Sequence, residues 1–267
     1  LASRLPALAM LLFGGAVIGL APILVRWAAA GPAAAGFWRL TLALPVLALI
    51  ARPWTPGAGG EGGQGPFPKI VLVAGVMFAL DLAFWHYGIA FTSVANATVL
   101  TNLTPVVVTF VAWIVFKERP GWLFVAAVAL AVAGAAMMSL GRGGDAPHPA
   151  PNPLLGDALS LTTALWYAGY LLAVGRARLK IGAARVMFWS SLVGAVLLLA
   201  ASWALGEPLT PRSMGGWAAV VGLAAMHITG QGSIAWSLGR LPTATASIVV
   251  LIQPVVAAIL GWLLFQE

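Results

Sequence analysis

The chain has 267 residues, of which 61% are hydrophobic and only 8% are Asp, Glu, Lys or Arg. Its mean hydropathy is +0.98, whereas soluble domains are roughly a quarter charged. A chain this apolar has too few polar side chains to cover a water-facing surface, so we expect its solvent to be lipid. It contains no cysteine, which excludes disulfides and thiolate metal sites.

Apolar runs follow one another along the chain, each of a length that crosses about 30 Å of hydrocarbon. We predict nine transmembrane helices, at 5–27, 33–51, 68–90, 94–116, 121–140, 154–175, 184–205, 214–236 and 243–265. The Gly- and Pro-rich stretches at 55–68 and 141–153 are typical of flexible aqueous loops. The first run is too long for a cleaved signal peptide, and Arg26 follows it in place of a cleavage site, so we expect a permanent helix.

The positions of the cations predict an orientation. With the N-terminus on the cytoplasmic side, ten of the 14 lysines and arginines lie on that side. The other side receives Arg26, Arg39, Arg142 and Arg212. This distribution satisfies the positive-inside rule. The net charge of +7 is therefore explained by cations on the cytoplasmic side of the membrane, and nucleic acid is not expected as a partner.

One segment of the sequence occurs twice. PVVVTFVAWIVFKE at 105–118 returns as PVVAAILGWLLFQE at 254–267, with six residues identical in place, and the alignment extends without gaps from 87–118 onto 236–267. Five predicted helices fit in this period of 149 residues. Because five is odd, the second copy must enter the membrane from the opposite side.

The repeat predicts the fold class: an all-α polytopic membrane protein made of two inverted repeats of five helices. We place the first repeat at 1–140, the connecting loop at 141–153 and the second repeat at 154–267. Glu118 is followed by a fifth helix, whereas nothing follows Glu267. We therefore expect a tenth helix to be missing from this sequence.

These features resemble the EamA-type branch of the drug/metabolite transporter superfamily. The resemblance rests on the double repeat, on Arg39 early in the second helix, and on a mid-helix Pro with a terminal Glu in each half, Pro105 with Glu118 and Pro254 with Glu267. It covers the whole chain, and aromatic content makes the bacterial aromatic amino acid exporters the most similar group. It implies ten helices, cytoplasmic termini, a cavity lined by helices 1, 3, 4, 6, 8 and 9, and export of metabolites across a bacterial inner (cytoplasmic) membrane.

Proton coupling would need a titratable group inside a span. Asp81 is the only acid well inside a predicted helix; Trp85 shares its face one turn later, and His86 is close by. Polar groups in hydrocarbon are costly and usually have a function. Asp81 or His86 could take up a proton and couple transport to a gradient. The alternative is a buried acid that is hydrogen-bonded for packing.

Other polar and aromatic side chains inside the spans are candidates for substrate binding. His227 with Gln231, and Trp166 with Tyr170, are spaced i, i+4 on their helices. Aromatic faces would hold a flat apolar ligand or a cation, but the same patterns also serve packing and interhelical hydrogen bonds. The predicted substrate-binding residues are Trp85, His86, Asn102, Trp166, Tyr170, His227, Gln231 and Gln253.

Prolines within predicted spans are candidate hinges. Pro22, Pro105 and Pro254 each remove a backbone donor and free a carbonyl, which is tolerable at membrane depth only where protein or water satisfies it. The freed carbonyls could accept hydrogen bonds from a substrate ammonium. For Arg39, near the first outer turn, snorkelling to the interface and capture of a substrate carboxylate are the two interpretations.

We predict a secondary transporter that exports small metabolites, in particular aromatic and other neutral amino acids, by alternating access. The alternative is efflux of aromatic organic cations in exchange for protons. An enzyme is not expected, because three scattered His and one buried Asp form neither a nucleophile with its base nor a metal cluster. We expect no cofactor and no metal; the partners are the small-molecule substrate and the lipid bilayer. The oligomeric state stays open, with a monomer as one option.

Overall fold

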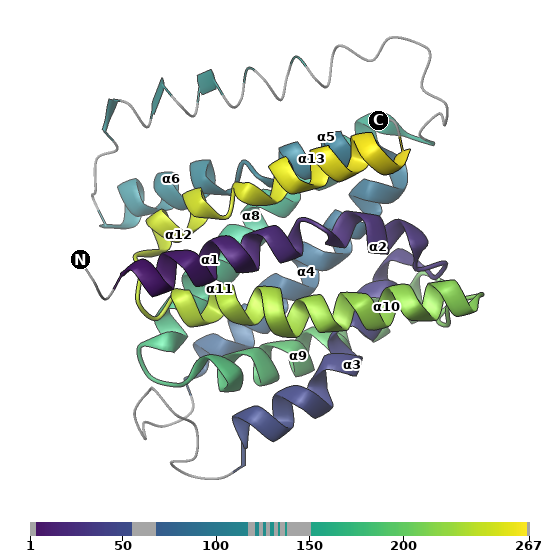
Figure 1. Cartoon of the computed structure of the whole chain (residues 1–267), viewed down its shortest axis with the longest axis horizontal. Helices are drawn as coiled ribbons and strands as arrows, with labels where there is room; N and C mark the ends of the chain where they lie inside the picture. Colours follow the sequence, from purple (N-terminus) through teal and green to yellow (C-terminus); the bar gives the residue numbers. More distant parts are fainter. Residues whose placement is uncertain are drawn as a thin grey trace.

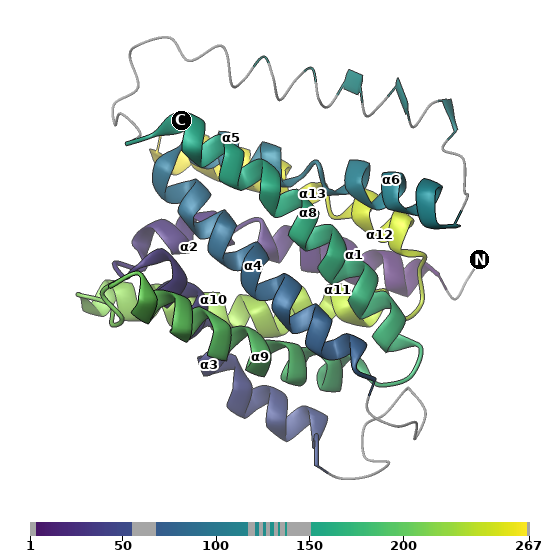
Figure 2. The same ribbon diagram turned by 180° about the vertical axis from the view of Figure 1, so that it is seen from behind.

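The computed structural model of the chain describes residues 4–54, 68–116 and 151–265, with isolated positions between 121 and 137. Every regular element in these ranges is a helix (Figures 1 and 2). Six of the described helical segments are long and apolar enough to cross a membrane, and two shorter apolar helices accompany them. An all-helical polytopic architecture is therefore confirmed for this part of the chain, whereas the count of five plus five helices stays a prediction.

The described helices fall into two groups along the sequence. The first comprises α1 (Leu5–Ile18), α2 (Ala21–Trp27), α3 (Pro32–Ala51), α4 (Ile70–Phe91), α5 (Val94–Thr101) and α6 (Thr104–Phe116). The second comprises α8 (Pro153–Arg178), α9 (Ala183–Ala204), α10 (Met214–Met226), η1 (His227–Gln231), α11 (Gly232–Ser237), α12 (Thr243–Val249) and α13 (Ile252–Phe265).

Most predicted spans are present with ends within three residues of those expected. Apart from isolated positions, the predicted helix at 121–140 lies outside the described residues, as do most of the two loops and the paired Glu118 and Glu267.

Local sequence explains where several helices begin. Pro32 and Pro153 occupy the first position of their helices, where a missing N–H costs nothing and the fixed φ suits the helix. Ser93, Asn152 and Ser213 cap α5, α8 and α10 by accepting a hydrogen bond from a backbone N–H three residues later. The polar residues between the apolar runs therefore fix where these helices begin.

Three predicted spans are interrupted near their middle. The first breaks between α1 and α2, the fourth between α5 and α6, and the ninth between α12 and α13. The three predicted hinges Pro22, Pro105 and Pro254 are the second or third residue of the piece that follows each break. A helix restarts readily at proline, so these residues begin a new helix instead of bending a continuous one.

Close packing of α4 against α8 and α9 forms the centre of the bundle. Glycines permit the approach: a Cβ on Gly75 would lie 2.9 Å from the carbonyl oxygen of Ser190, and one on Gly156 would lie 2.7 Å from the backbone nitrogen of Thr92. Gly88 likewise faces Ser160. Small residues that let backbones approach are the usual device for packing helices in lipid.

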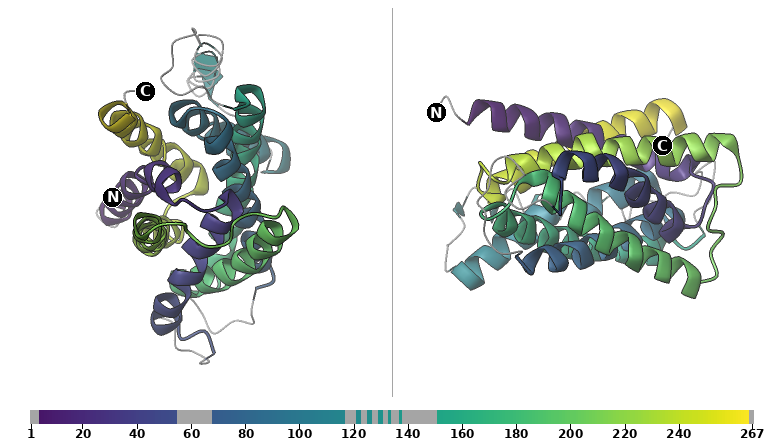
Figure 3. Two further views of the ribbon diagram at one scale, coloured as in Figure 1. Left: turned by 90° about the vertical axis from the view of Figure 1, so that its right-hand side faces the viewer. Right: turned by 90° about the horizontal axis from the view of Figure 1, so that it is seen from below.

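The two interrupted helices of the repeat lie antiparallel. The second piece of one contacts the first piece of the other in both directions, α13 with α5 and α12 with α6, and Figures 1 and 2 show the two running in opposite senses. In Figure 3 (left) the yellow C-terminal helix lies beside the purple N-terminal one. Their starts, Val94 and Thr243, and their ends, Phe116 and Phe265, are each 149 residues apart. Opposite orientation is what an inverted repeat requires of this pair.

Candidate functional site

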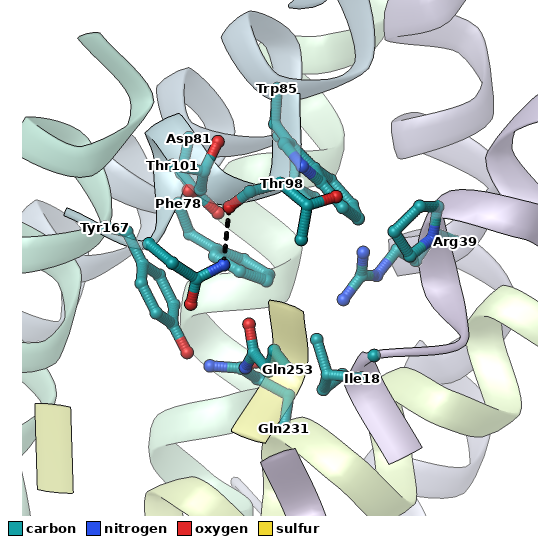
Figure 4. A pocket seen from close by; sticks show the side chains of 14 residues that line it. Ile18, Arg39, Phe78, Asp81, Trp85, Thr98, Thr101, Tyr167, Gln231 and Gln253 are labelled. Carbon is teal, nitrogen blue, oxygen red and sulfur yellow. Dashed lines mark hydrogen bonds between the residues drawn. The ribbon is translucent and has the colours of Figure 1, made fainter. Parts of the chain in front are cut away.

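A small polar cavity lies where the three helix interruptions meet (Figure 4). Ile18 and Gly19 reach it from the α1–α2 break, Thr101 and Asn102 from the α5–α6 break, and Gln253 from the start of α13. Its volume is about 40 Å³, enough for a few water molecules. The remaining lining residues are Pro22, Arg39, Phe78, Asp81, Leu82, Trp85, Thr98, Tyr167 and Gln231.

Gly19 brings two of these interruptions together. A Cβ at this position would lie 2.9 Å from the carbonyl oxygen of Gln253 and 2.7 Å from Cβ of Val256. Only a residue without a side chain lets the first helix approach α13 this closely. The cavity is therefore built on a direct contact between the two halves of the sequence.

One cation and one anion face the cavity. Arg39 projects from α3 and is 2% exposed, and Asp81 projects from α4 and is 6% exposed. Their opposite charges attract each other across the cavity. Arg39 Nε and Nη1 have no hydrogen-bond partner among the described residues. A buried charge normally demands such partners, so this guanidinium is poised to bind an anionic group.

Tyr167, Gln231 and Gln253 form a neutral polar wall opposite these charges (Figure 4). The Tyr167 hydroxyl lies beside both amides and interacts with each of them. Asn102 Nδ2 donates to the carbonyl oxygen of Thr98 at 2.7 Å. Polar groups at membrane depth are costly and usually have a function, so this wall is a candidate for contact with a substrate.

Aromatic rings make the remaining wall. Phe78 stacks on Tyr170 with ring centroids 4.5 Å apart and on His227 with centroids 5.3 Å apart. The Arg39 guanidinium carbon lies 5.9 Å from the centroid of Phe78, within the range of a cation–π interaction. Of these rings only Phe78 lines the cavity, and with Trp85 it gives the cavity an apolar face beside its charged groups.

The π-helix η1 positions Gln231. It lies between α10 and α11 within one continuous helix, Met214–Ser237, and carries His227 at its first residue and Gln231 at its last. His227 Nε2 lies 2.8 Å from Ser191 Oγ on α9, while Gln231 lines the cavity. Short π-helical segments occur frequently at functional sites, and this one fixes which polar side chain reaches the site.

The structure brings six of the predicted functional residues together. They come from α2, α4, α5–α6, η1 and α13, and are Pro22, Asp81, Trp85, Asn102, Gln231 and Gln253.

The other predicted residues lie away from the cavity. His86 Nδ1 is 2.8 Å from the carbonyl oxygen of Pro32; since a carbonyl only accepts, Nδ1 carries the proton. Tyr170 donates to Met187 Sδ at 3.6 Å. Trp166 packs edge-to-face on a phenylalanine, Phe84, with centroids 5.8 Å apart. Pro105 and Pro254 are close to the breaks but do not line the site, and His227 is held by Ser191.

Several cavity residues were not selected from sequence. Arg39 had been counted with the outer cations, but the structure places it in the interior, so it does not snorkel. Phe78 is the repeat equivalent of His227, and the two rings stack; the period of 149 residues would have indicated their proximity. Tyr167 follows the predicted residue Trp166 on α8. The Tyr167 side chain lines the cavity, whereas that of Trp166 does not.

The α9–α10 loop closes one end of the bundle. Glu207 in this loop accepts hydrogen bonds from the backbone nitrogens of Ala33 at 3.2 Å and Ala34 at 2.9 Å, and from the Tyr87 hydroxyl. Carboxylates are favourable at a helix N-terminus because the macrodipole is positive there. Trp38 Nε1 also donates to the carbonyl oxygen of Leu209 at 2.8 Å. The orientation predicted from the cations would place residues 205–213 on the outer side, and we name them the outer loop.

The opposite end is held by different contacts. Arg178 at the end of α8 donates from Nε to the carbonyl oxygen of Ala235 at 3.0 Å and from Nη1 to that of Ile181 at 2.7 Å. Ser237 Oγ donates to the carbonyl oxygen of Ala7 at 3.0 Å. Helices from both halves are therefore tied together at both ends, with the cavity between them.

Membrane-length helices around a small polar cavity are the architecture of a polytopic membrane protein and are compatible with a transporter. The sequence profile of the EamA-like transporter family matches residues 5–140 and 154–267. The chain belongs to this family, and it is a membrane transporter of the drug/metabolite kind.

The fold is also that of a solved protein. A crystal structure that is 21% identical in sequence aligns over 97% of this chain and 88% of its own, with a TM-score of 0.67. No curated protein is similar enough to give a match.

Proposed function

We propose that this transporter exports small metabolites, in particular aromatic and other neutral amino acids, by alternating access. It would act across a bacterial inner membrane, with its N-terminus in the cytoplasm. The distribution of cations supports the orientation, and the direction of transport follows the resemblance to amino acid exporters. No catalytic activity and no cofactor are part of the proposal.

A zwitterion matches the charges of the cavity. Arg39 offers unpartnered N–H groups to a carboxylate, and guanidinium–carboxylate pairs form two parallel hydrogen bonds. Asp81 offers an anion to an ammonium group. Between them, Phe78 and Trp85 provide the apolar face for the side chain.

The buried guanidinium of Arg39 carries the proposal. An organic cation entering the cavity could pair with Asp81, but it would leave this guanidinium at low dielectric without an anionic group of the substrate. An amino acid instead brings a carboxylate that neutralises it. This observation favours amino acids over the alternative, efflux of aromatic organic cations.

Alternating access has a structural basis in the interrupted helices. The pieces on either side of each break can rotate separately, since the α-helical hydrogen-bond pattern is interrupted there. The outer loop would release one end and the Arg178 contacts the other. The cavity of about 40 Å³ is small, so binding requires one of these ends to open.

The test is transport by the purified chain in proteoliposomes. Labelled phenylalanine, leucine and an aromatic organic cation are supplied to the wild type and to Arg39→Gln, Arg39→Lys and Arg212→Gln. We expect the wild type to transport both amino acids. Arg39→Gln should weaken their apparent affinity roughly 10- to 150-fold, the value of a charge-assisted hydrogen bond of about 1.5 to 3 kcal/mol.

Arg39→Lys should recover part of this loss, because it keeps the charge without the planar fork. Arg212 lies exposed in the outer loop and is the matched control; its replacement should leave transport unchanged. Movement of the organic cation without the amino acids would refute the proposal, and so would full amino acid transport by Arg39→Gln.

A further inference from the structure

A second hollow lies on the opposite side of η1 from the polar cavity. It is a groove of about 460 Å³ between α1, α3, α9 and the η1–α11 segment. Its main walls are apolar: Met10, Phe13, Leu47, Ile50, Met187 and Trp236. We call it the lateral groove.

The lateral groove opens towards the surroundings of the bundle. Met10 is 38% exposed, Phe13 51% and Ile50 60%. These residues lie on helices long and apolar enough to span a membrane, so their exposed faces contact hydrocarbon. The natural occupant of such a groove is an acyl chain.

Positive charge surrounds one end of the groove. All four helices that form it have an arginine at that end: Arg4 before α1, Arg52 after α3, Arg185 in the first turn of α9 and Arg240 after α11. Figure 1 shows these four helix ends on the same side of the molecule, to the left.

Two contacts join this charge to the groove itself. The Arg240 guanidinium carbon lies 3.5 Å from the ring centroid of Trp236, a groove residue. Arg185 follows the groove residue Ala184 and donates from Nη2 to the carbonyl oxygen of Arg52 at 3.3 Å. The ends of α3, α9 and α11 thus present their cations where a chain lying in the groove would carry its headgroup.

We propose that the lateral groove binds an anionic phospholipid, with an acyl chain against Phe13, Ile50 and Trp236 and the phosphate among the arginines. A free anion would leave the apolar walls uncovered, and a zwitterionic lipid would bring no net negative charge to the four arginines. A juxtamembrane basic cluster attracts anionic headgroups by about fivefold in affinity per cation.

The bound lipid would contact η1 from outside. Ile228 and Thr229 of this segment line the lateral groove, whereas Gln231 lines the polar cavity. An occupied groove therefore fixes the position of the segment that supplies Gln231. The inference does not depend on which substrate the transporter carries.

The chain offers a substitution that fills the groove. A Cβ on Gly232 would meet no atom within 4 Å, and Gly232 is a helical residue that lines the groove. Gly232→Leu should thus be accepted by the helix while its side chain occupies the space of the acyl chain. Gly215→Leu is the matched control, because a Cβ there meets only Ser213 Oγ at 3.8 Å, at the far end of the same span.

The experiment uses the purified full chain in detergent after removal of lipid. Phosphatidylglycerol and phosphatidylcholine with identical acyl chains are added separately; thermal unfolding gives the shift in Tm, and native mass spectrometry gives the number of lipids retained. We expect phosphatidylglycerol to raise the Tm of the wild type and of Gly215→Leu by several degrees, with one lipid retained, and to leave Gly232→Leu unshifted.

Charge variants complete the test. The double variant Arg4→Gln with Arg52→Gln should weaken the lipid's apparent affinity by roughly 25-fold, and Arg212→Gln should not change it. Equal stabilisation by phosphatidylcholine would overturn the proposal, as would an unchanged response of Gly232→Leu. Stabilisation by inorganic phosphate alone would identify an anion site, and loss of lipid binding on dimer formation would identify a protein interface; either result overturns the assignment.

Discussion

Removing the charge of Glu207 should open the outer end of the transporter. Glu207→Gln keeps the shape of the side chain but turns one of its two acceptor oxygens into an NH2 donor, so that at least one of the hydrogen bonds from Ala33 N, Ala34 N and the Tyr87 hydroxyl is lost and the others become neutral. It also removes a negative charge from the N-terminus of α3. Both effects destabilise the state in which the outer loop is closed.

The magnitude follows from these contacts. A hydrogen bond to a charged group contributes about 1.5 to 3 kcal/mol and a neutral one about 0.5 to 1.5, and the helix dipole adds about 0.3 to 1 kcal/mol. Glu207 is half-buried, so solvent screens part of this difference, and we take about 2 kcal/mol in total. The population open at this end should then rise about 30-fold.

Cysteine accessibility measures this population. The chain has no native cysteine, so a single Thr98→Cys in the cavity reports access to it. A membrane-impermeant maleimide is applied from the side that the outer loop faces, with and without Glu207→Gln. We expect labelling to be up to about 30-fold faster in the variant, and about fivefold faster with Tyr87→Phe, which removes one donor at a cost of about 1 kcal/mol.

Thr210→Ala, an exposed position of the same loop, is the control and should label at the parental rate. Unchanged labelling in Glu207→Gln would show that the outer loop does not limit access. Faster labelling in all three variants would show instead that the loop is disturbed as a whole, and the reasoning from the carboxylate would be wrong.

Three further predictions concern the bundle interior. Asp81→Asn should abolish the stimulation of transport by a pH gradient and should also weaken the apparent affinity of exchange without a gradient, because it removes the anion that faces the substrate ammonium; retained stimulation would exclude Asp81 as the coupling residue. Ser191→Ala should lower the free energy of unfolding by about 1 to 3 kcal/mol, because His227 Nε2 loses its partner in a buried site; an unchanged Tm would contradict this. Gly75→Ala should lower the Tm, since its Cβ would lie 2.6 Å from a side-chain carbon of α9, whereas Gly215→Ala should not.

Helix positions could be predicted from the sequence because a membrane span is a property of local composition. The predicted span at 214–236 corresponds to described helices over Met214–Ser237, and that at 94–116 to Val94–Phe116. The interruptions could not be predicted, because a proline in an apolar run is compatible with both a kink and a restart. Only the packing of the halves, such as Gly19 against Gln253, determines that the chain breaks there.

The site was predicted in part, for a comparable reason. Asp81, Gln231 and Gln253 were found because polar residues in spans are rare. The sequence does not reveal which way such a side chain points, so His86 and Trp166 were chosen although they lie outside the cavity. The same ambiguity led the cationic side chain of Arg39 to be counted with the membrane interface.

The π-helical segment also has a mechanical consequence. The π-helical turn contains one residue more than an α-helical turn. Moving that surplus residue along the helix rotates the residues between its old and new positions by about 100° and shifts them by about 1.5 Å. Moved past Ser237, it would sweep the Gln231 amide out of the cavity and pull Ser237 away from Ala7, so that the same shift would loosen the substrate and the far end of the bundle together.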